Sequence, residues 1–395
     1  MHMHLPPDGK PISLIASIAP MFGNGWRDGG CKNDDERWFM NIDIAVLPGD
    51  GIGVEVIAAG MQVLEHTARK SGHKVNATYA DVGWAAIDKH GTALPAATRE
   101  ICQKNKAILF GAVGLPDRDQ TLPQAQRPER VALLELRKGL FANLRHVVLP
   151  PGLADHCPLK KQLIAAGIDI MIIRELTGGL YYGKPQGISG HPGDRLAVDT
   201  MAYTEKEIRR ILKVGFETAR KRRRRLTSVD KANILATSQL WRETAVAMAK
   251  DYPDVQLEHM YVDNASMQLL RRPTEFDVIV TENTFGDILS DEASMLCGSI
   301  GLVPSACLGE DAAATPFYEP IHGSAPDIAG RNKANPVGSI LTVAMMLRYT
   351  FGLEQEAAAI EKACFKVLND AKILTGDLGG TSSCTDVAAA IITAM

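Results

Sequence analysis

Short apolar runs alternate with amphipathic segments along most of the chain. Residues 41–47, 107–113 and 168–175 are apolar stretches of strand length, whereas residues 54–70 and 95–105 have the polar and apolar spacing of helices. Strands that alternate with helices are typical of a largely parallel sheet covered by helices. The pattern therefore predicts an α/β fold.

The second half of the chain continues this alternation after one irregular segment. Residues 177–203 contain a Gly- and Pro-rich piece between two short segments, which predicts a protruding hairpin or arm. Such arms often mediate contacts between the subunits of a dimer. Further strands and helices are predicted at residues 75–82, 128–138, 204–225, 226–230, 238–251, 256–262, 266–271, 277–281 and from 338 to 395.

The composition is that of an ordinary globular protein. Of the 395 residues, 46% are hydrophobic and 23% are charged, and the length allows two or three domains. The net charge of -3 gives no reason to expect nucleic acid or an anionic membrane as a partner, and no apolar run is long enough for a membrane span. The basic run at 220–225 is interpreted as the solvated, cationic C-terminus of a helix.

The seven cysteines are scattered and form no CxxC pair. This fits reduced thiols in a cytoplasmic protein better than a disulfide framework or a zinc site. Residues 1–39 differ from the rest, with Pro6-Pro7, Gly-rich pieces and a short apolar run that prolines interrupt. We interpret them as a disordered or non-native extension rather than as a signal peptide, and expect the folded unit to start near residue 40.

Two aspartates give the first indication of chemistry. Asp287 and Asp291 lie in TENTFGDILSDEASMLCGSI, residues 281–300, which predicts a strand end, a turn and a helix. On a helix they occupy one face, one turn apart. Carboxylates held this close repel each other unless a positive group lies between them, and a hard cation such as Mg²⁺ or Mn²⁺ prefers such oxygen ligands. The alternative is a solvated acidic helix face.

Other charged residues stand at the ends of predicted elements. Three arginines, Arg137, Arg145 and Arg174, suit a substrate with several carboxylates, although surface salt bridges are the alternative for each. The loop at 319–336 is rich in Gly and Pro but also holds His322 and Asp327. An acidic residue in a nucleotide-binding loop can accept a hydrogen bond from a ribose 2′-hydroxyl and disfavour a 2′-phosphate.

The ordered set of motifs resembles a known family. PGDGIG, LRKGLFANLR, RELTGGLYYG, SVDKAN, YVDNASMQL, TENTFGDILSDEAS and EPIHGSAPDIAG each fall at a predicted strand end or turn. On these motifs, residues 40–395 closely resemble the β-decarboxylating dehydrogenases that act on isocitrate and isopropylmalate. The resemblance implies an open α/β sandwich with a mostly parallel sheet, not a Rossmann fold, and a homodimer whose active site is shared between subunits.

The resemblance also implies a division into two domains. Residues 40–140 together with 299–395 would form the NAD-binding domain, and residues 141–298 would form the second domain, with the dimer arm and the metal-site residues. The NAD-binding residues would be His322, Gly323, Ser324, Ala325, Pro326, Asp327, Ile328 and Asn335. Of these, Asp327 and Ile328 would favour NAD over NADP.

The family's roles for the remaining motif residues follow in the same way. The substrate carboxylates would be held by Arg137, Arg145 and Arg174. The Mg²⁺ or Mn²⁺ ligands would be Asp287 and Asp291 of one subunit and Asp263 of the other, which also contacts the substrate. Lys231, also from the other subunit, would help to remove the proton from the C2 hydroxyl, and Tyr181 would protonate the enol after decarboxylation.

Leu133 and Leu134 bear on the choice of substrate. In the resemblance they match leucines that face the isopropyl group of 3-isopropylmalate, an intermediate of leucine biosynthesis, where isocitrate enzymes present polar residues. An apolar pocket suits a branched alkyl chain and penalises a buried, unpaired carboxylate. The alternative is that both leucines belong to a core-facing helix stripe.

The sequence departs from the family pattern at one functional segment. Arg137 and Arg145 are separated by eight positions where ten are usual, and His146 stands where proline is common. Two alternatives to isopropylmalate oxidation therefore stay open. One is a sister enzyme acting on isocitrate, homoisocitrate, D-malate or tartrate, and the other is a non-catalytic paralogue that keeps the fold.

Overall fold

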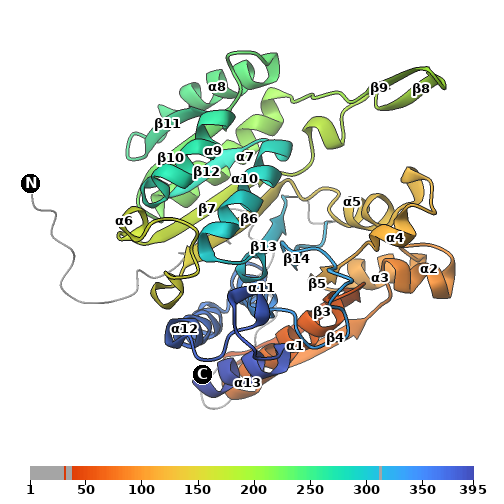
Figure 1. Cartoon of the computed structure of the whole chain (residues 1–395), viewed down its shortest axis with the longest axis vertical. Coiled ribbons are helices and arrows are strands. Elements are labelled where there is room, and N and C mark those ends of the chain that lie inside the picture. Colours follow the sequence, from red (N-terminus) through yellow and green to blue (C-terminus); the bar gives the residue numbers. More distant parts are fainter. Residues whose placement is uncertain (1–30, 33–37, 311–313) are drawn as a thin grey trace, which may run out of the picture.

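The computed structural model describes residues 31–32, 38–310 and 314–395 (Figure 1). Most of the predicted extension, residues 1–30 and 33–37, lies outside the described residues. Its described part forms two short strands, β1 (Cys31–Lys32) and β2 (Trp38–Phe39), which pair with each other in antiparallel orientation. The large sheet begins directly afterwards, at β3 (Asn41–Gly49).

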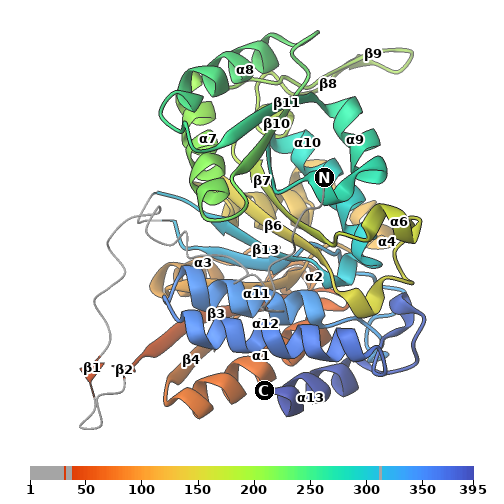
Figure 2. The ribbon, with the colours of Figure 1, turned by 90° about the vertical axis from the view of Figure 1, so that its left-hand side faces the viewer.

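One ten-stranded sheet runs through both halves of the molecule, in the order β11-β10-β12-β7-β6-β13-β14-β5-β3-β4 (Figures 1 and 2). Its strands are parallel except where β6 meets β7 and β13 and where β13 meets β14. The mostly parallel sheet that the sequence predicted is therefore confirmed. Its other strands are β4 (Lys74–Tyr79), β5 (Ala107–Ala112), β6 (Ala142–Leu149), β7 (Ile168–Glu175), β10 (Arg225–Asp230), β11 (Gln256–Tyr261), β12 (Val278–Thr281), β13 (Pro304–Leu308) and β14 (Phe317–Pro320).

Helices cover both faces of this sheet. Figure 2 shows α1, α11, α12 and α13 on one face of the lower half, and α7 with α8 opposite α9 with α10 in the upper half. None of the described helices is long and apolar enough to cross a membrane. The longer helices are α1 (Gly53–Ser71), α2 (Trp84–His90), α3 (Ala96–Lys104), α7 (Glu205–Arg220), α8 (Ala236–Ala249), α9 (Val262–Arg271), α10 (Asn283–Ser294), α11 (Val337–Tyr349), α12 (Glu354–Asp370) and α13 (Cys384–Ala394).

The sequence of each helix matches its place in the layers. Every residue of α11 is buried, as expected for a helix that is apolar on all sides and packed between the sheet and other helices. By contrast, α7 has one buried face and a charged one. It begins at a capping box, in which Thr204 accepts from the Glu207 backbone and Glu207 accepts from the Thr204 backbone.

Three strands of the large sheet were not predicted from the sequence, namely β6, β13 and β14. They lie together at the centre of the sheet, where the antiparallel pairs are. β13 and β14 are short and buried throughout, so they lack the alternating polar positions that identify a strand, whereas β6 has eight residues and carries Asn143 and Arg145 on one face, a signal that the prediction missed. The predicted division into domains stays a proposal. It would cut the sheet between β6 and β13, with five strands on each side.

The interpretation of the basic run as solvated was wrong in part. The helix α7 ends at Arg220, earlier than predicted, and the chain then turns back toward the sheet. The Arg222 side chain is only 7% exposed and pairs with Asp169 at 2.7 Å and with Asp277 at 2.8 Å. Asp169 also accepts from His146 at 2.7 Å, which gives this unusual histidine a partner on the neighbouring strand. Arg222 therefore neutralises one buried and one partly buried carboxylate.

The predicted arm is present as an isolated hairpin. Its strands are β8 (Gly187–His191) and β9 (Asp194–Val198), which pair only with each other and extend away from the body (Figure 1). Ile188 and Leu196 on it are 70% and 62% exposed. A two-stranded ribbon with exposed apolar side chains is marginal in water by itself, so this arm is a surface suited to a partner.

Candidate active site

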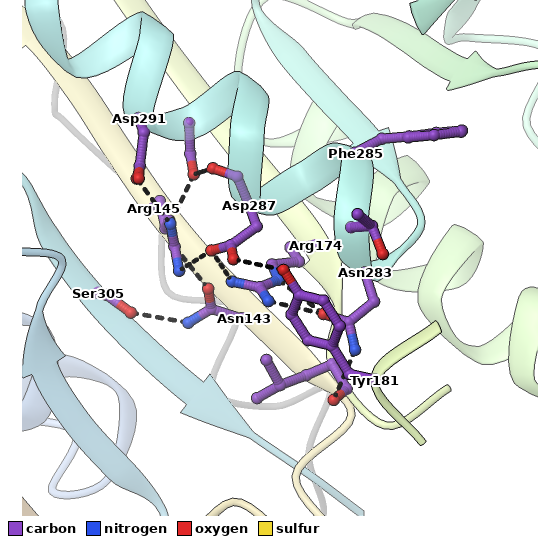
Figure 3. A network of polar contacts seen from close by, with 12 residues as sticks. Asn143, Arg145, Arg174, Tyr181, Asn283, Phe285, Asp287, Asp291 and Ser305 are labelled. Carbon is purple, nitrogen blue, oxygen red and sulfur yellow. Dashed lines mark hydrogen bonds and ion pairs between the residues drawn. The ribbon is translucent and has the colours of Figure 1, made fainter. Parts of the chain in front are cut away.

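Asp287 and Asp291 lie on α10, as the sequence predicted. The helix follows β12 directly, and its first turn is capped by Glu282, whose carboxylate accepts from the backbone N–H of Thr284 at 3.0 Å and of Phe285 at 2.7 Å. This cap fixes where the helix begins. Both aspartates consequently point from one face of α10 toward β6 and β7 (Figure 3).

Two arginines on these neighbouring strands meet the aspartates. Arg145 on β6 donates to Asp287 at 3.2 Å and to Asp291 at 3.4 Å, and Arg174 on β7 donates through Nη1 to the same Asp287 oxygen. The two guanidinium groups are buried, with 6% and 2% of the side chains exposed. The shortened segment before β6 therefore does not keep Arg145 from the predicted metal carboxylates.

The charges of this cluster shift its pKa values in opposite directions. Burial would raise the pKa of Asp287, but Arg174, Arg145 and the hydrogen bond from Tyr181 lower it overall. Burial raises the pKa of Asp291, and the nearby Asp287 adds to this shift. Burial and the neighbouring Arg145 lower the pKa of Arg174 to about 10. At neutral pH Asp287 is thus an anion between two cations.

Tyr181 joins the same cluster from the turn after β7. It lies at the end of the short helix η6 (Gly179–Tyr181), and its hydroxyl donates to Asp287 Oδ2 at 2.9 Å. Burial and the charge of Asp287 raise the pKa of Tyr181 above its ordinary value of 10.0. The hydroxyl therefore keeps its proton at neutral pH, which is the state a general acid needs.

Arg137 lies nearby, held by a different carboxylate. Its Nε donates to Glu319 at the end of β14 at 3.0 Å, and the two side chains are 11% and 8% exposed. Although burial opposes it, the charge of Glu319 raises the pKa of Arg137. The positive charge of Arg137 also acts on Arg174 and Asp287. The three predicted arginines therefore belong to one electrostatic site.

The predicted substrate-selecting leucines lie one turn before Arg137. Residues Glu129–Leu133 form a π-helical turn, η4, which continues into the short helix α5 (Leu134–Leu136). Leu133 packs partly buried against a hydrophobic cluster that includes Ala132 and Leu140, whereas Leu134 is half-buried outside that cluster. The alternative interpretation, that these leucines belong to a core-facing helix stripe, thus fits Leu133 better than Leu134.

Lys231 and Asp263 form a separate pair. Lys231 follows β10 and donates to Asp263 on α9 at 2.5 Å. The lysine lowers the pKa of this carboxyl. Neither side chain has a hydrogen bond or ion pair with Asp287 or Asp291 in the described part of the chain. One chain therefore brings together Arg137, Arg145, Arg174, Tyr181, Asp287 and Asp291, and places Lys231 and Asp263 outside this group.

The predicted nucleotide loop packs against the glycine-rich turn after β3. Ile52 donates its N–H to the Ser324 carbonyl at 2.7 Å, and the Ser324 hydroxyl donates to the Gly114 carbonyl at 2.5 Å. Gly51 has φ +58°, and a Cβ there would lie 1.9 Å from the Ser324 oxygen. Only glycine allows this approach, so the two motifs, distant in sequence, form one surface.

The side chains of this loop differ in how they are engaged. His322 is buried, and its Nδ1 lies 2.9 Å from the Gly323 carbonyl, while its Nε2 has no hydrogen-bond partner among the described residues. Asn335 donates to Asp377 at 2.9 Å and accepts from the Val337 backbone at 3.1 Å. The remaining predicted NAD residues are Gly323, Ala325, Pro326, Asp327 and Ile328, of which Gly323, Pro326 and Asp327 are exposed. An unpartnered imidazole nitrogen and an exposed carboxylate fit a polar ligand such as a nucleotide.

The carboxylates on α10 suit a hard cation but do not complete a site. Their oxygen atoms are the donor type that Mg²⁺ and Mn²⁺ prefer. Among the described residues, no group of three or more His, Cys, Asp or Glu side chains is placed to hold a metal ion. Two aspartates of one chain would hold such an ion only with further ligands from water, substrate or a second chain.

Comparisons with known proteins agree with this geometry. The sequence profile of the isocitrate/isopropylmalate dehydrogenase family matches residues 43–391. The 3-isopropylmalate dehydrogenase of Nitratidesulfovibrio vulgaris is 55% identical over 341 residues, which are 86% of this chain and 94% of the relative. That of Oleidesulfovibrio alaskensis is 56% identical over 348 residues, 87% of this chain and 96% of the relative.

Solved structures give the same result at lower identity. The isocitrate dehydrogenase of Methylococcus capsulatus has a TM-score of 0.78 at 35% identity and covers 89% of this chain and 98% of its own. A β-decarboxylating dehydrogenase of Thermococcus kodakarensis has a TM-score of 0.70, also at 35% identity, over 89% of this chain and 95% of its own. The fold and the matches are those of a class of decarboxylating oxidoreductases. The chain belongs to the isocitrate/isopropylmalate dehydrogenase family.

Several residues of the site were not singled out from the sequence. They are the hydrogen-bond partners of the arginines: Asn143, Asn283, Ser290 and Glu319. One local signal was available, because Asn143 precedes Arg145 by two positions and side chains two apart on a strand share a face. Asn283 and Ser290 also had a local signal, since they stand four residues before and three residues after Asp287 on α10. Glu319 comes from a distant segment, so no spacing in the sequence indicates it.

The contact between α10 and β7 can be tested at Gly286. A Cβ at this position would lie 2.7 Å from Cβ and Cγ of Arg174. Helix propensity alone predicts that Gly286→Ala stabilises the protein by about 1 kcal/mol. We expect the clash to reverse the sign and to lower the free energy of unfolding by about 1–3 kcal/mol in urea titrations. Gly376→Ala, where no atom lies within 4 Å of the new Cβ, is the matched control. A stabilised Gly286→Ala variant would contradict this packing.

Proposed function

We propose that the protein catalyses the NAD-dependent oxidative decarboxylation of (2R,3S)-3-isopropylmalate to 4-methyl-2-oxopentanoate and CO₂ in leucine biosynthesis. The observation that carries the proposal is the cluster of three buried arginines around Asp287, in a chain whose curated relatives named 3-isopropylmalate dehydrogenase are 53–56% identical. The isocitrate dehydrogenase structure is 35% identical, which favours the isopropylmalate activity.

The arginines supply the substrate's two carboxylates with partners. Each guanidinium can make paired hydrogen bonds to a carboxylate in a fixed plane. Arg145 and Arg174 are directed into one space by their bonds to Asp287, and Arg137 adds its charge from the side of β14. Because little of the three side chains is exposed to water, their electrostatic attraction for a dianionic substrate would be stronger than that of arginines in water.

We propose a Mg²⁺ or Mn²⁺ ion held by Asp287 and Asp291 with Asp263 of a second copy, and the oxygen-only donor set supports it. When bound, such an ion polarises hydroxyl and carbonyl oxygens of a substrate. The chain's own residues have two further tasks. Tyr181 holds a proton beside Asp287, ready for delivery to carbon, and Lys231 of the second copy would take the proton of the C2 hydroxyl.

The specificity for substrate and cofactor rests on apolar and acidic groups. Leu134, half-buried one turn before Arg137, would contact the isopropyl group, with Leu133 supporting it from the core side. We propose NAD as the cofactor on the loop from His322 to Asn335. The exposed Asp327 would accept from the ribose 2′-hydroxyl and repel a 2′-phosphate, and the orphaned His322 Nε2 marks a position for a further contact.

We also propose a homodimer formed through α9 and α10. On α9, the exposed Met267 and Leu270 share a stripe with Asp263, at spacings of four and seven residues. On α10, the exposed Ile288 and the Met295 that follows its end are seven residues apart, with Asp291 between them. Two apolar stripes that both carry predicted metal ligands support a second copy as the occupant of this face.

A symmetric dimer would explain the separation of Lys231 and Asp263 from the arginine cluster. Each copy would present this pair to the cluster of the other, and the exposed arm β8–β9 would add contact area.

A cytoplasmic location is part of the proposal. It is supported by six of the seven cysteines, at positions 102, 157, 297, 307, 364 and 384, which are buried free thiols that suit a reducing compartment.

The activity can be tested by initial rates of NADH or NADPH formation with purified protein. The substrates would be 3-isopropylmalate, isocitrate, homoisocitrate, D-malate and tartrate, each with NAD and NADP, with Mg²⁺ or Mn²⁺. We expect turnover of 3-isopropylmalate with NAD and its loss in EDTA. Faster turnover of another acid would assign a sister enzyme. No turnover of any acid by folded protein would favour the non-catalytic paralogue.

The dimer face can be tested by a charge on α10. Ile288 is 61% exposed in the single chain, and Ile288→Lys would place two like charges in a symmetric interface. We expect the dimer dissociation constant, measured by sedimentation, to rise roughly 100- to 1000-fold. Val246→Lys, on the exposed face of α8 at 51% exposure, is the matched control and should leave it unchanged. Equal dissociation constants for both variants would show that the interface does not include this face of α10.

A further inference from the structure

The Asn283 side chain connects Arg174, the turn that leads to Tyr181 and helix α10. Asn283 is the first residue of α10, four residues before Asp287, and its side chain is fully buried. Figure 3 shows its amide on the side of the Arg174 guanidinium away from Arg145. Its side chain has no charge and makes no hydrogen bond to Asp287 or Asp291 in the described part of the chain, so the function described above leaves it without a role.

All hydrogen-bonding capacity of this amide is used within the site. Its Oδ1 accepts from Arg174 Nε at 2.9 Å and from Arg174 Nη2 at 2.7 Å. Its Nδ2 donates to the carbonyl of Leu176 at 3.2 Å and to that of Gly178 at 3.0 Å. The orientation of the amide is unambiguous, because the opposite one would point donors at a cation and an acceptor at two carbonyls.

The oxygen side of the amide sets the direction of Arg174. Two of the three guanidinium nitrogens are occupied by Asn283, and the third, Nη1, donates to Asp287. A guanidinium is planar, so fixing one edge fixes the direction of the other. Asn283 therefore keeps Nη1 of Arg174 directed toward the space above Asp287.

The nitrogen side of the amide sets the position of Tyr181. The carbonyls of Leu176 and Gly178 belong to the turn that leads from β7 into η6, and Tyr181 is the last residue of η6. This turn has little freedom on its other side, because a Cβ at Gly179 would lie 2.4 Å from the hydroxyl of Tyr203. The two bonds from Asn283 close the turn against α10 and bring the Tyr181 hydroxyl to Asp287.

We propose that Asn283 is a positioning residue that holds the substrate-binding Arg174 and the proton-donating Tyr181 in one geometry. Only an amide serves both, since a carboxylate lacks the donors and an apolar side chain lacks the acceptor as well. The inference rests on the proposed function for its kinetic consequences. The positional claim stands on the hydrogen bonds alone.

Two substitutions separate the two halves of this role. Asn283→Asp keeps the acceptor for Arg174 and loses the donors to the turn, so we expect kcat for 3-isopropylmalate to fall about 10- to 100-fold with KM little changed. Asn283→Leu loses both, so we expect KM to rise as well. Asn105→Asp is the control, because Asn105 is a half-buried amide that donates to a backbone carbonyl, at 2.8 Å to Ile101, but lies directly after the end of α3.

A double-mutant cycle distinguishes positioning from general loss of structure. If Asn283 acts through Tyr181, Asn283→Asp should lower kcat much less in a Tyr181→Phe background than in the wild type. The same fold-loss in both backgrounds would overturn the inference. A crystal structure of Asn283→Asp tests it without turnover: the turn from Leu176 to Tyr181 should move while Arg174 stays. An unmoved turn would overturn the inference even if the wild-type protein turned over none of the acids, a result that by itself counts only against the proposed function.

Discussion

The candidate site depends on Asp287, a carboxylate held between two buried guanidinium groups. Neither Arg145 nor Arg174 could be buried at low cost without it, because an unpaired charge in a protein interior is strongly destabilising. In turn both arginines, together with the hydrogen bond from Tyr181, lower the pKa of Asp287 and so favour its anionic form. The three groups come from β6, β7 and α10, so this one interaction sets the position of the helix on the sheet.

The residues of one chain do not bring together all the groups that the proposed function requires. The three arginines of the site are balanced by Glu319, Asp287 and Asp291, so the substrate carboxylates of the proposed function would have to share or replace these partners. In the proposed function Tyr181 would supply a proton there, and the base Lys231 lies outside the cluster of its own chain. The exposed apolar stripes on α9 and α10 and the Lys231–Asp263 pair beside them account for this gap if a second copy docks on that face.

Much of this organisation could be predicted from the sequence, and the failures have physical causes. The parallel strands, the helices and the facing of Asp287 and Asp291 follow from periodicity, since a side chain's neighbours on its own element are fixed by spacing. The central strands β13 and β14 were missed because they are short and buried on both faces, which removes the periodic signal, whereas β6 was missed although Asn143 and Arg145 alternate along it. Asn283 and Glu319 were missed because their roles depend on contacts across the fold. The environment of Arg222, partnered by buried aspartates rather than by water, also depends on tertiary structure.

The most direct test of the account is complementation between two inactive variants. Lys231→Ala and Asp287→Asn would each be inactive as homodimers, and their mixed dimers would contain one site with both residues intact and one with neither. After unfolding and refolding together in equal amounts, activity on 3-isopropylmalate should return to about a quarter of the wild-type value, because half of the dimers are mixed and half of their sites are whole. No recovery, from mixed dimers shown to have formed, would contradict a site shared between two copies of this chain.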